Sequence, residues 1–500
     1  MSNHLIEADT MSQDEIRTRP DEIEMDEQAS SSSSEPIVLG RNVGLPGCVG
    51  MVMGIIIGTG IFISPAGVLA GAGGSVGLSL VIWVICASIA TCGAMCYTEL
   101  SLTSGKSGGE FIFILEHFGP VLAFLRMWTI LAIIMPCISA IQGITIANYL
   151  TTPFFSDCEH VPVDAIRLIA VVVIFGLVYI NCVSVKWSSR LINTLTITKV
   201  IGLLVLIITG LVYICRGNTS NLTDAFAIPM DVNIPMAIYS GIFAFGGWES
   251  IAMIVEEIKN PERNVPLSII ISMVVITSIY LLANVAYLVI LSPAQILASK
   301  AVAADFSVIA LGTWSWTIWV FVALSAIGNL NAIFFGFSRV YYAAARDGLL
   351  PEVIGMINIR HRTPLPSVIV TVPIVMICLM VDDVFKLIQY QSFVMVAFQA
   401  ITVCIIPYSR WKYPDLHRPF KVPVIIAVLF AVAMLFLMGL TLYTSPVSSG
   451  LGLLLTLIGV PIYFIFVRWN KPLWFRKITG SITRPFQKLF FVIPEEAKTQ

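Results

Sequence analysis

Charged side chains are scarce in this sequence. Asp, Glu, Lys and Arg make up only 12% of its 500 residues, whereas hydrophobic residues make up 57%. A soluble globular protein carries about a quarter of its residues as charged side chains to cover its surface. The shortage excludes an ordinary soluble protein with a large core. It predicts that most of the apolar excess faces lipid.

Histidine and the usual enzyme motifs are also scarce. The sequence contains no HExxH or CxxC spacing, and the segment GKSGG at Gly105–Gly109 lacks the full spacing of a phosphate-binding loop. No ring of charges or repeated filter sequence indicates a channel. The only histidines lie outside the interior of the predicted spans: His4, His117, His160, His361 and His417. We therefore predict no catalytic residue, no metal site, no cofactor and no ATP-driven step.

Long apolar runs recur along the whole chain. A membrane-spanning helix needs about 20 mainly apolar residues to cross a hydrocarbon layer about 30 Å thick. The sequence predicts an all-α polytopic membrane protein with twelve transmembrane helices, over residues 43–71, 76–103, 120–151, 163–184, 190–214, 234–257, 266–292, 311–345, 365–382, 386–408, 422–443 and 450–468.

The N-terminal segment has a different composition. It is acidic, carries the serine run Ser30–Ser34 and has no apolar core. This pattern predicts no cleavable signal peptide. It also predicts a disordered acidic tail over residues 1–42.

The basic residues fall mainly on one side of the predicted membrane. Cytoplasmic loops of membrane proteins are enriched in Lys and Arg. If the N-terminus is cytoplasmic, the outer side receives only Arg167, Arg216, Lys300 and Lys386. The cytoplasmic side then holds Lys106, Lys186, Arg190, Lys259, Arg263, Arg339, Arg346, Arg360, Arg362, Arg410, Lys412, Arg418, Lys421 and a basic tail over 469–500. Both termini are therefore predicted to be cytoplasmic.

Two predicted spans contain glycine clusters at mid-membrane depth. The first span carries IIIGTGIFISP (Ile55–Pro65) and the sixth carries GIFAFGGWES (Gly241–Ser250). Unwound backbone leaves unpaired N–H and C=O groups in lipid, so such clusters are costly unless they line a cavity. Interrupted helices at matching positions of two halves indicate an inverted-repeat transporter. The alternative, that these glycines only allow close helix packing, is disfavoured because the clusters occur as a pair.

The two interruptions suit a zwitterionic ligand. A half-helix that starts near Ile61 presents free N–H groups and a positive dipole end to a carboxylate. Half-helices that end near Ile57 and Phe245 present free carbonyls to an ammonium group, and glycine allows close approach. The sequence thus predicts a site for a free amino acid, with Phe243 as a candidate lid over it.

Two ionisable residues inside predicted spans are further candidates, because charge is costly in lipid. Lys199 lies deep in the fifth span. Its ammonium group either takes the place of a sodium ion between the first and eighth spans or neutralises a buried carboxylate. Glu249 follows the Gly246–Gly247 pair. It attracts a cationic side chain, takes up a proton or pairs with a lysine structurally.

One cysteine lies apart from the others. Cys158 is in the predicted outer loop between the third and fourth spans, where disulfides persist. A lone exposed cysteine there indicates either an intermolecular bridge or a free thiol. Asn218 and Asn221 begin glycosylation sequons on the same side, close to the membrane.

These motifs give the sequence a resemblance to a known family. The chain resembles the light (catalytic) subunits of heteromeric amino acid transporters, within the amino acid–polyamine–organocation superfamily, over about Val43–Glu496. The motifs are IIIGTGIFISP, CYTELS (Cys96–Ser101), KSGGEF (Lys106–Phe111), PFFSDC (Pro153–Cys158), FAFGGW (Phe243–Trp248), EEIKNPERNVPL (Glu256–Leu267), SRVYYAAARDGLLP (Ser338–Pro351) and HRPFKVP (His417–Pro423).

The resemblance implies a LeuT-type fold of two inverted five-helix repeats with broken helices 1 and 6, and two additional helices. The repeats would cover residues 43–214 and 234–408, and the additional helices 422–468. It also implies exchange of L-amino acids across the plasma membrane by alternating access.

The resemblance also implies roles for single residues. Thr59, Gly60 and Ile61 match the loop that receives the substrate carboxylate, and Ile57 ends the preceding half-helix. Phe243 matches the aromatic gate. The other matches are Gly246 in the substrate-facing unwound segment, Lys199 as the substitute for sodium, and Cys158 as the cysteine bridged to a single-pass glycoprotein heavy chain.

Three positions depart from the family pattern. Glu249 replaces the Asn of several relatives, Met135 stands where relatives often carry Arg, Lys or Glu, and Val396 replaces an aromatic residue of the tenth span. The sequence therefore predicts exchange of neutral amino acids, with cationic ones open. A cystine/glutamate-type exchanger and a membrane scaffold without transport are the alternatives, and Met135 gives no support to the anionic mode.

Overall fold

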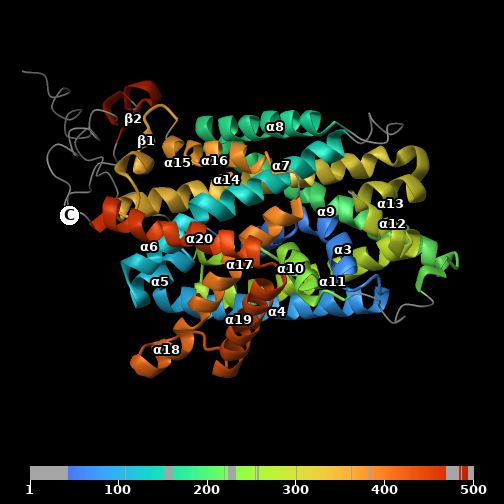
Figure 1. Cartoon of the computed structure of the whole chain (residues 1–500), viewed down its shortest axis with the longest axis horizontal. Coiled ribbons are helices and arrows are strands. Elements are labelled where there is room, and N and C mark those ends of the chain that lie inside the picture. Colours follow the sequence, from blue (N-terminus) through green and yellow to red (C-terminus); the bar gives the residue numbers. More distant parts are fainter. Residues whose placement is uncertain are drawn as a thin grey trace, which may run out of the picture. The chain divides into compact units, whose positions relative to one another are not determined.

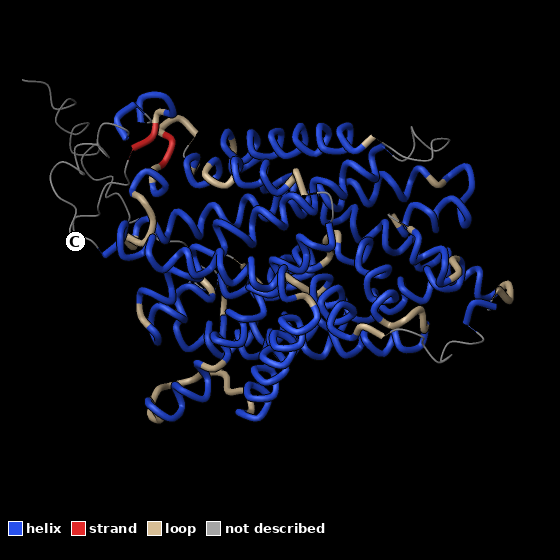
Figure 2. Tube along the Cα trace, in the orientation of Figure 1, coloured by secondary structure: helices blue, strands red, loops and turns tan. Residues whose placement is uncertain are grey.

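Apolar helices make up nearly all of the protein where its structure is described. The computed structural model describes residues 43–493 except 107, 152–161, 219, 223–231, 254, 256–257, 300, 362, 382–383, 469–482 and 486. Helices dominate these residues, and the two short strands form one small antiparallel pair (Figure 2). Cys158 and the acidic tail lie outside the described residues.

Nine helices in the described part of the chain are long and apolar enough to cross a membrane. A tenth span is added if one bent pair counts as a single crossing. The nine are built from α4 (Val76–Ser104), α6 (Pro120–Thr129) with η1 (Ile130–Ile134) and α7 (Met135–Thr151), α8 (Val163–Val183), α9 (Val185–Cys215), α11 (Pro261–Ile290), α14 (Trp316–Arg346), α17 (Val384–Val403) with α18 (Ile405–Lys412), α19 (Val424–Thr444), and α20 (Pro446–Tyr463) with η8 (Phe464–Arg468).

The bent pair and three shorter apolar helices account for the remaining apolar runs. The bent pair consists of α2 (Leu45–Ile56) and α3 (Gly60–Gly71), which meet at 51°. The shorter segments are α10 (Ile234–Ala244), α13 with η6 (Val302–Trp314), and α15 with α16 (Leu365–Cys378). The chain is therefore a polytopic, almost all-helical membrane protein, as the sequence predicts.

The remaining short elements lie in the connections. They are α5 (Glu110–Phe118), η3 (Ser220–Leu222), η4 (Trp248–Met253), α12 (Pro293–Ala298), η7 (Glu352–Gly355), β1 (Ile357–Asn358) and β2 (Val492–Ile493). In Figure 1, α12 and α13 lie at one end of the long helices and the β1–β2 pair lies at the other end.

The long helices carry apolar residues on their outer faces as well as on the faces packed inside the bundle. On α8, Ala170 and Ile174 are buried, whereas Leu168, Val172 and Phe175 are exposed. An exposed apolar stripe of this length would be unfavourable in water but is stable in hydrocarbon. These faces indicate the lipid boundary of the bundle.

A hydrogen-bonded network of polar residues joins three of the helices. Asn181 of α8 donates to the Asn331 side-chain oxygen at 2.7 Å, and Ser188 donates to the Asn181 oxygen at 2.9 Å. The Asn331 amide donates to the Ser188 carbonyl at 3.0 Å. Buried polar groups need such partners, so this network fixes the packing of α8, α9 and α14.

Candidate functional site

The first predicted span is interrupted where its glycines lie. The helix α2 ends at Ile56, and α3 begins at Gly60 with Thr59 as its N-terminal cap. The Phe62 and Ile63 N–H groups bond back to the Thr59 carbonyl, whereas the first N–H groups of α3 have no intrahelical partner, as at the start of any helix. The predicted break is confirmed, and its two helix ends lie within a residue of the predicted positions near Ile57 and Ile61.

The sixth predicted span is interrupted in the same way. The helix α10 ends at Ala244, and a turn over 245–247 leads into the 3₁₀-helix η4. Gly247 has a φ of +109°, which favours glycine because an L side chain is strained there. The carbonyl end near Phe245 that the sequence predicts is therefore present.

The two interruptions lie against each other. A Cβ atom added to Gly60 would lie 2.4 Å from the Ala244 Cα, and one added to Gly247 would lie 2.7 Å from the Ile55 Cγ2. One added to Gly58 would lie 2.3 Å from the Asn329 amide nitrogen on α14. Glycine is needed here for close packing as well as for the breaks.

A tyrosine on α11 joins the ends of both broken helices. The Tyr280 hydroxyl lies 2.9 Å from the Ile56 carbonyl and 3.1 Å from the Ala244 carbonyl. Tyr280 is fully buried. Each carbonyl is the last of its helix and lacks a partner within that helix. The Ile56 carbonyl also accepts a hydrogen bond from the Gly58 N–H at 2.8 Å, so the Tyr280 hydroxyl links this turn to the end of α10.

Substituting Tyr280 with phenylalanine should lower both stability and transport. The change removes the hydroxyl donor of the Ala244 carbonyl and leaves the Ile56 carbonyl with the Gly58 N–H alone, and an unpaired buried carbonyl costs about 1–3 kcal/mol. We expect a lower unfolding temperature and a several-fold lower initial rate of amino acid uptake. Tyr443→Phe is the matched control because Tyr443 is 86% exposed. Equal behaviour of the two variants would contradict a role for the shared hydroxyl.

A cavity of about 160 Å³ lies beside the two interruptions. Of the predicted site residues, Thr59, Gly60, Phe243, Gly246 and Glu249 line it. The cavity also contains side-chain oxygens without a hydrogen-bond partner among the described residues: Gln142 Oε1, Ser250 Oγ, Asn329 Oδ1 and Gln391 Oε1. Buried polar atoms are normally paired, so these oxygens indicate a space for a polar solute and water.

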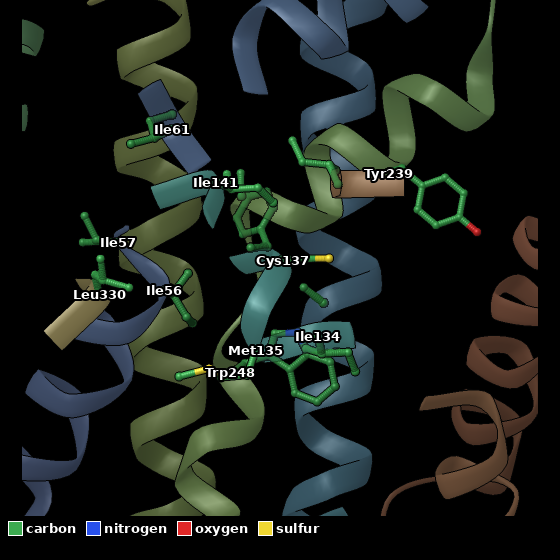
Figure 3. Close-up of a cluster of buried hydrophobic side chains, with 14 of the residues drawn as sticks. Ile56, Ile57, Ile61, Ile134, Met135, Cys137, Ile141, Tyr239, Trp248 and Leu330 are labelled. Carbon is green, nitrogen blue, oxygen red and sulfur yellow. The ribbon is translucent and has the colours of Figure 1, made fainter. Parts of the chain in front are cut away.

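The other predicted residues of the first break are placed differently. Ile57 and Ile61 are almost fully buried, and their side chains belong to the apolar cluster around the break (Figure 3). Neither residue lines the cavity. Any contribution of these residues to ligand binding must come from their backbone groups.

Lys199 reaches the first broken span. Its Nζ donates to the Gly54 carbonyl of α2 at 2.8 Å, and the residue is only 2% exposed. The described residues show no acidic partner and no hydrogen bond from Lys199 to α14. The proposed link to the first span is therefore present. The link to the eighth span and the pairing with a buried carboxylate are not found in the described part.

Glu249 faces the cavity from η4. One of its carboxylate oxygens accepts a hydrogen bond from the Gly247 N–H at 3.1 Å. No lysine forms an ion pair with Glu249 among the described residues. The structural lysine pairing that the sequence left open is therefore not seen there.

Two charged cavity residues were not singled out from the sequence. Glu110 at the start of α5 and Arg126 of α6 form an ion pair in the cavity wall. Arg126 lies inside the third predicted span, so the rule that selected Lys199 also applied to it. Of the positions that depart from the family pattern, Val396 lines the cavity. Met135 is buried outside the cavity lining, and its sulfur accepts a hydrogen bond from the Ser139 hydroxyl. The basic group of the cavity is thus at Arg126 and not at Met135.

The described residues offer no resident metal site. No group of three or more His, Cys, Asp or Glu side chains in that part of the chain is arranged to hold a metal ion.

What distinguishes the site is a pair of helix breaks beside a polar cavity within an apolar helical bundle. The family described as "Amino acid permease" matches residues 43–482. The chain belongs to this family.

Individual relatives agree with the family over nearly the whole chain. The human cystine/glutamate transporter is 43% identical and is covered over 93% of each chain. The mouse large neutral amino acids transporter small subunit 2 is 37% identical over 95% of this chain and 90% of its own length. The human Asc-type amino acid transporter 1 is 36% identical over 93% of this chain and 90% of its own. This permease is therefore an amino acid transporter and not an enzyme.

Proposed function

We propose that this permease exchanges neutral L-amino acids, and cationic ones in addition, by alternating access. The observation that supports this most directly is the pair of broken helices in contact at Gly60 and Ala244, beside a cavity with unpaired polar atoms. N–H groups in the first turn of α3 suit the substrate carboxylate. Carbonyls in the last turns of α2 and α10 other than the two bonded to Tyr280 suit its ammonium group, and Ile55 and Ile242 of these turns line the cavity. Phe243 covers the substrate from α10.

A twelve-span, two-repeat fold is consistent with the helices described. The nine long helices, the bent pair, α10 with η4, and α15 with α16 make twelve candidate crossings. We assign residues 43–214 to the first repeat, 234–408 to the inverted second repeat and 422–468 to two additional helices. The interruptions then fall in the first helix of each repeat, as expected for transporters of this architecture.

Replacing Glu249 with glutamine should weaken the binding of cationic substrates. The carboxylate lines the cavity without an ion-pair partner among the described residues, so it can attract a lysine or arginine side chain. We expect competition by these amino acids to weaken about tenfold, with neutral substrates little changed. The measurement is inhibition of uptake by a panel of neutral, cationic and anionic amino acids. An unaltered charge preference in the Glu249→Gln variant would refute the role of Glu249 in binding cationic substrates.

A second candidate function is exchange of anionic amino acids. Its support is the 43% identity to the human cystine/glutamate transporter and the presence of Arg126 in the cavity. The ion pair with Glu110 occupies that guanidinium, so we place this function second. The same competition panel decides between the two.

We further propose a single-pass glycoprotein heavy chain as partner, bridged through Cys158 in the plasma membrane, with both light-chain termini cytoplasmic. The support is the term "small subunit" in the name of the mouse relative and the exposed position predicted for Cys158. On a non-reducing gel, the wild-type protein should give a high-mass band that disappears when reducing agent is added. Replacing Cys158 with serine should abolish this band. Cys215, an exposed cysteine near the outer end of α9, is the matched control. An unchanged gel after Cys158→Ser would count against the bridge.

The exchange itself is tested with full-length protein in proteoliposomes. Uptake of a labelled neutral amino acid should require an unlabelled amino acid inside the vesicles. An exchanger changes back to its outward-facing conformation only when it has bound a substrate on the inner side. Equal uptake into empty and loaded vesicles would refute exchange. No uptake under either condition would favour the scaffold alternative.

A further inference from the structure

A buried ion pair forms part of the cavity wall. The Arg126 Nε of α6 pairs with the Glu110 Oε2 at the start of α5. The Tyr97 hydroxyl of α4 donates to the other oxygen of Glu110. Both charged residues are almost fully buried, with Arg126 5% exposed. Each therefore depends on its partner, since a lone buried charge is strongly unfavourable.

The guanidinium group of Arg126, a residue of the cavity wall, still has hydrogen-bonding capacity. Arg126 Nη1 is buried and has no hydrogen-bond partner among the described residues. The group lies 5.4 Å from the centre of the Phe398 ring, so one neighbour of the guanidinium is an apolar face. Without Glu110, this arginine would offer a full positive charge and a free donor to a ligand.

A third charge faces the same cavity. Glu249 lies close enough to both Glu110 and Arg126 to interact electrostatically with them. Two carboxylates therefore face one guanidinium, which leaves one negative charge in excess when all three are ionised. An anionic substrate side chain would meet this excess and would find Arg126 already paired.

We propose that Glu110 determines the charge selectivity of this transporter by neutralising Arg126, so that amino acids with an anionic side chain are excluded. This inference rests on the proposed transport function and specifies its substrate class. The Arg126–Glu110 pair acts as one neutral unit of the wall, and Glu249 sets the remaining charge. Glu110 is thus a specificity-determining residue on the helix between the second and third spans.

The first test replaces Glu110 with glutamine. Glutamine has nearly the same size and can still accept the Tyr97 hydroxyl bond, but it leaves the Arg126 charge unpaired. In proteoliposomes, the ratio of labelled glutamate uptake to labelled serine uptake should rise about tenfold. Glu116→Gln is the matched control. Glu116 lies on the same helix and pairs with Lys106 at 2.8 Å, outside the cavity lining. Its ratio should stay at the wild-type value.

The second test replaces Arg126 with glutamine. The cavity then holds two unpaired carboxylates, so the ratio of labelled lysine uptake to labelled serine uptake should rise, again by about tenfold. A merely structural role for the pair would lower all uptake together and move neither ratio. A higher glutamate-to-serine ratio in Glu110→Gln together with a higher lysine-to-serine ratio in Arg126→Gln supports the proposal. An active variant whose ratio stays at the wild-type value overturns it.

The double variant Glu110→Gln with Arg126→Gln guards against misfolding of the single variants. It removes both members of the ion pair and leaves the charge of Glu249 as in the wild type, so it should transport serine with both wild-type ratios. A double variant that gains glutamate or lysine uptake would overturn the proposal. Wild-type vesicles that transport none of the three amino acids would instead refute the proposed function, so the two failures are distinguishable.

Discussion

Substituting Lys199 with methionine should abolish exchange of neutral amino acids. The lysine Nζ donates to the Gly54 carbonyl in the last turn of α2, beside the first interruption. Methionine preserves the apolar bulk but removes the charge and the donor. A buried carbonyl left unpaired costs about 1–3 kcal/mol, and the end of the broken helix loses the cation that holds it. We expect the initial rate of uptake to fall more than tenfold.

Sodium substitution provides the second part of this experiment. A lysine that takes the place of a bound cation predicts equal wild-type uptake in sodium and in choline buffer. Lys186→Met is the matched control, because Lys186 is exposed near the start of the same helix α9. Wild-type uptake that requires sodium, or a Lys199→Met variant within twofold of wild type, would be incompatible with this role.

Substituting Gly60 with alanine should also eliminate transport. The added Cβ would lie 2.4 Å from the Ala244 Cα and 3.2 Å from the Ala244 nitrogen. These are backbone atoms and cannot rotate away, so α3 and α10 would have to move apart. Overpacking of this kind costs about 1–3 kcal/mol, and here it separates the two helix breaks that would hold the substrate. We expect more than a tenfold loss of uptake with a modest fall in unfolding temperature.

A glycine elsewhere in the same broken span provides the control. A Cβ added to Gly50 of α2 would meet no atom within 4 Å. Gly50→Ala should therefore keep wild-type uptake and unfolding temperature, since alanine also suits a helix better than glycine does. Gly60→Ala with the behaviour of Gly50→Ala would show that the contact between the broken helices does not matter for transport.

Local chemistry made much of the fold predictable. Apolar runs fixed the helices to within a few residues over most of their length; α4, for example, was expected over 76–103 and extends over Val76–Ser104. The helix interruptions were predictable for the same reason, because glycine pairs inside an apolar run interrupt the helix at that position. The expected ninth span, 365–382, was the weakest of these predictions. The structure has two short helices there, Leu365–Ile369 and Val372–Cys378.

Pairing between distant residues was the part that could not be predicted. Tyr280 is one of several tyrosines in apolar runs, and nothing near it in the sequence indicates that it bonds two helix ends. Glu110 and Arg126 are 16 positions apart in the sequence, and only the packing of α5 and α6 shows that they form an ion pair. Pairing of Glu249 with a lysine is one of the alternatives that the sequence leaves open, but its carboxylate accepts a hydrogen bond from the Gly247 N–H of its own turn.

The sequence by itself determined that the protein lies in lipid, where its helices run and where they break. Hydrophobicity and glycine content set these features locally, at the residues that carry them. Only the tertiary structure decided which side chains share the cavity and which of its charges are cancelled. That outcome depends on contacts between helices far apart in the chain, and in a low-dielectric interior the contact partner, more than the residue type, determines what a charge can bind.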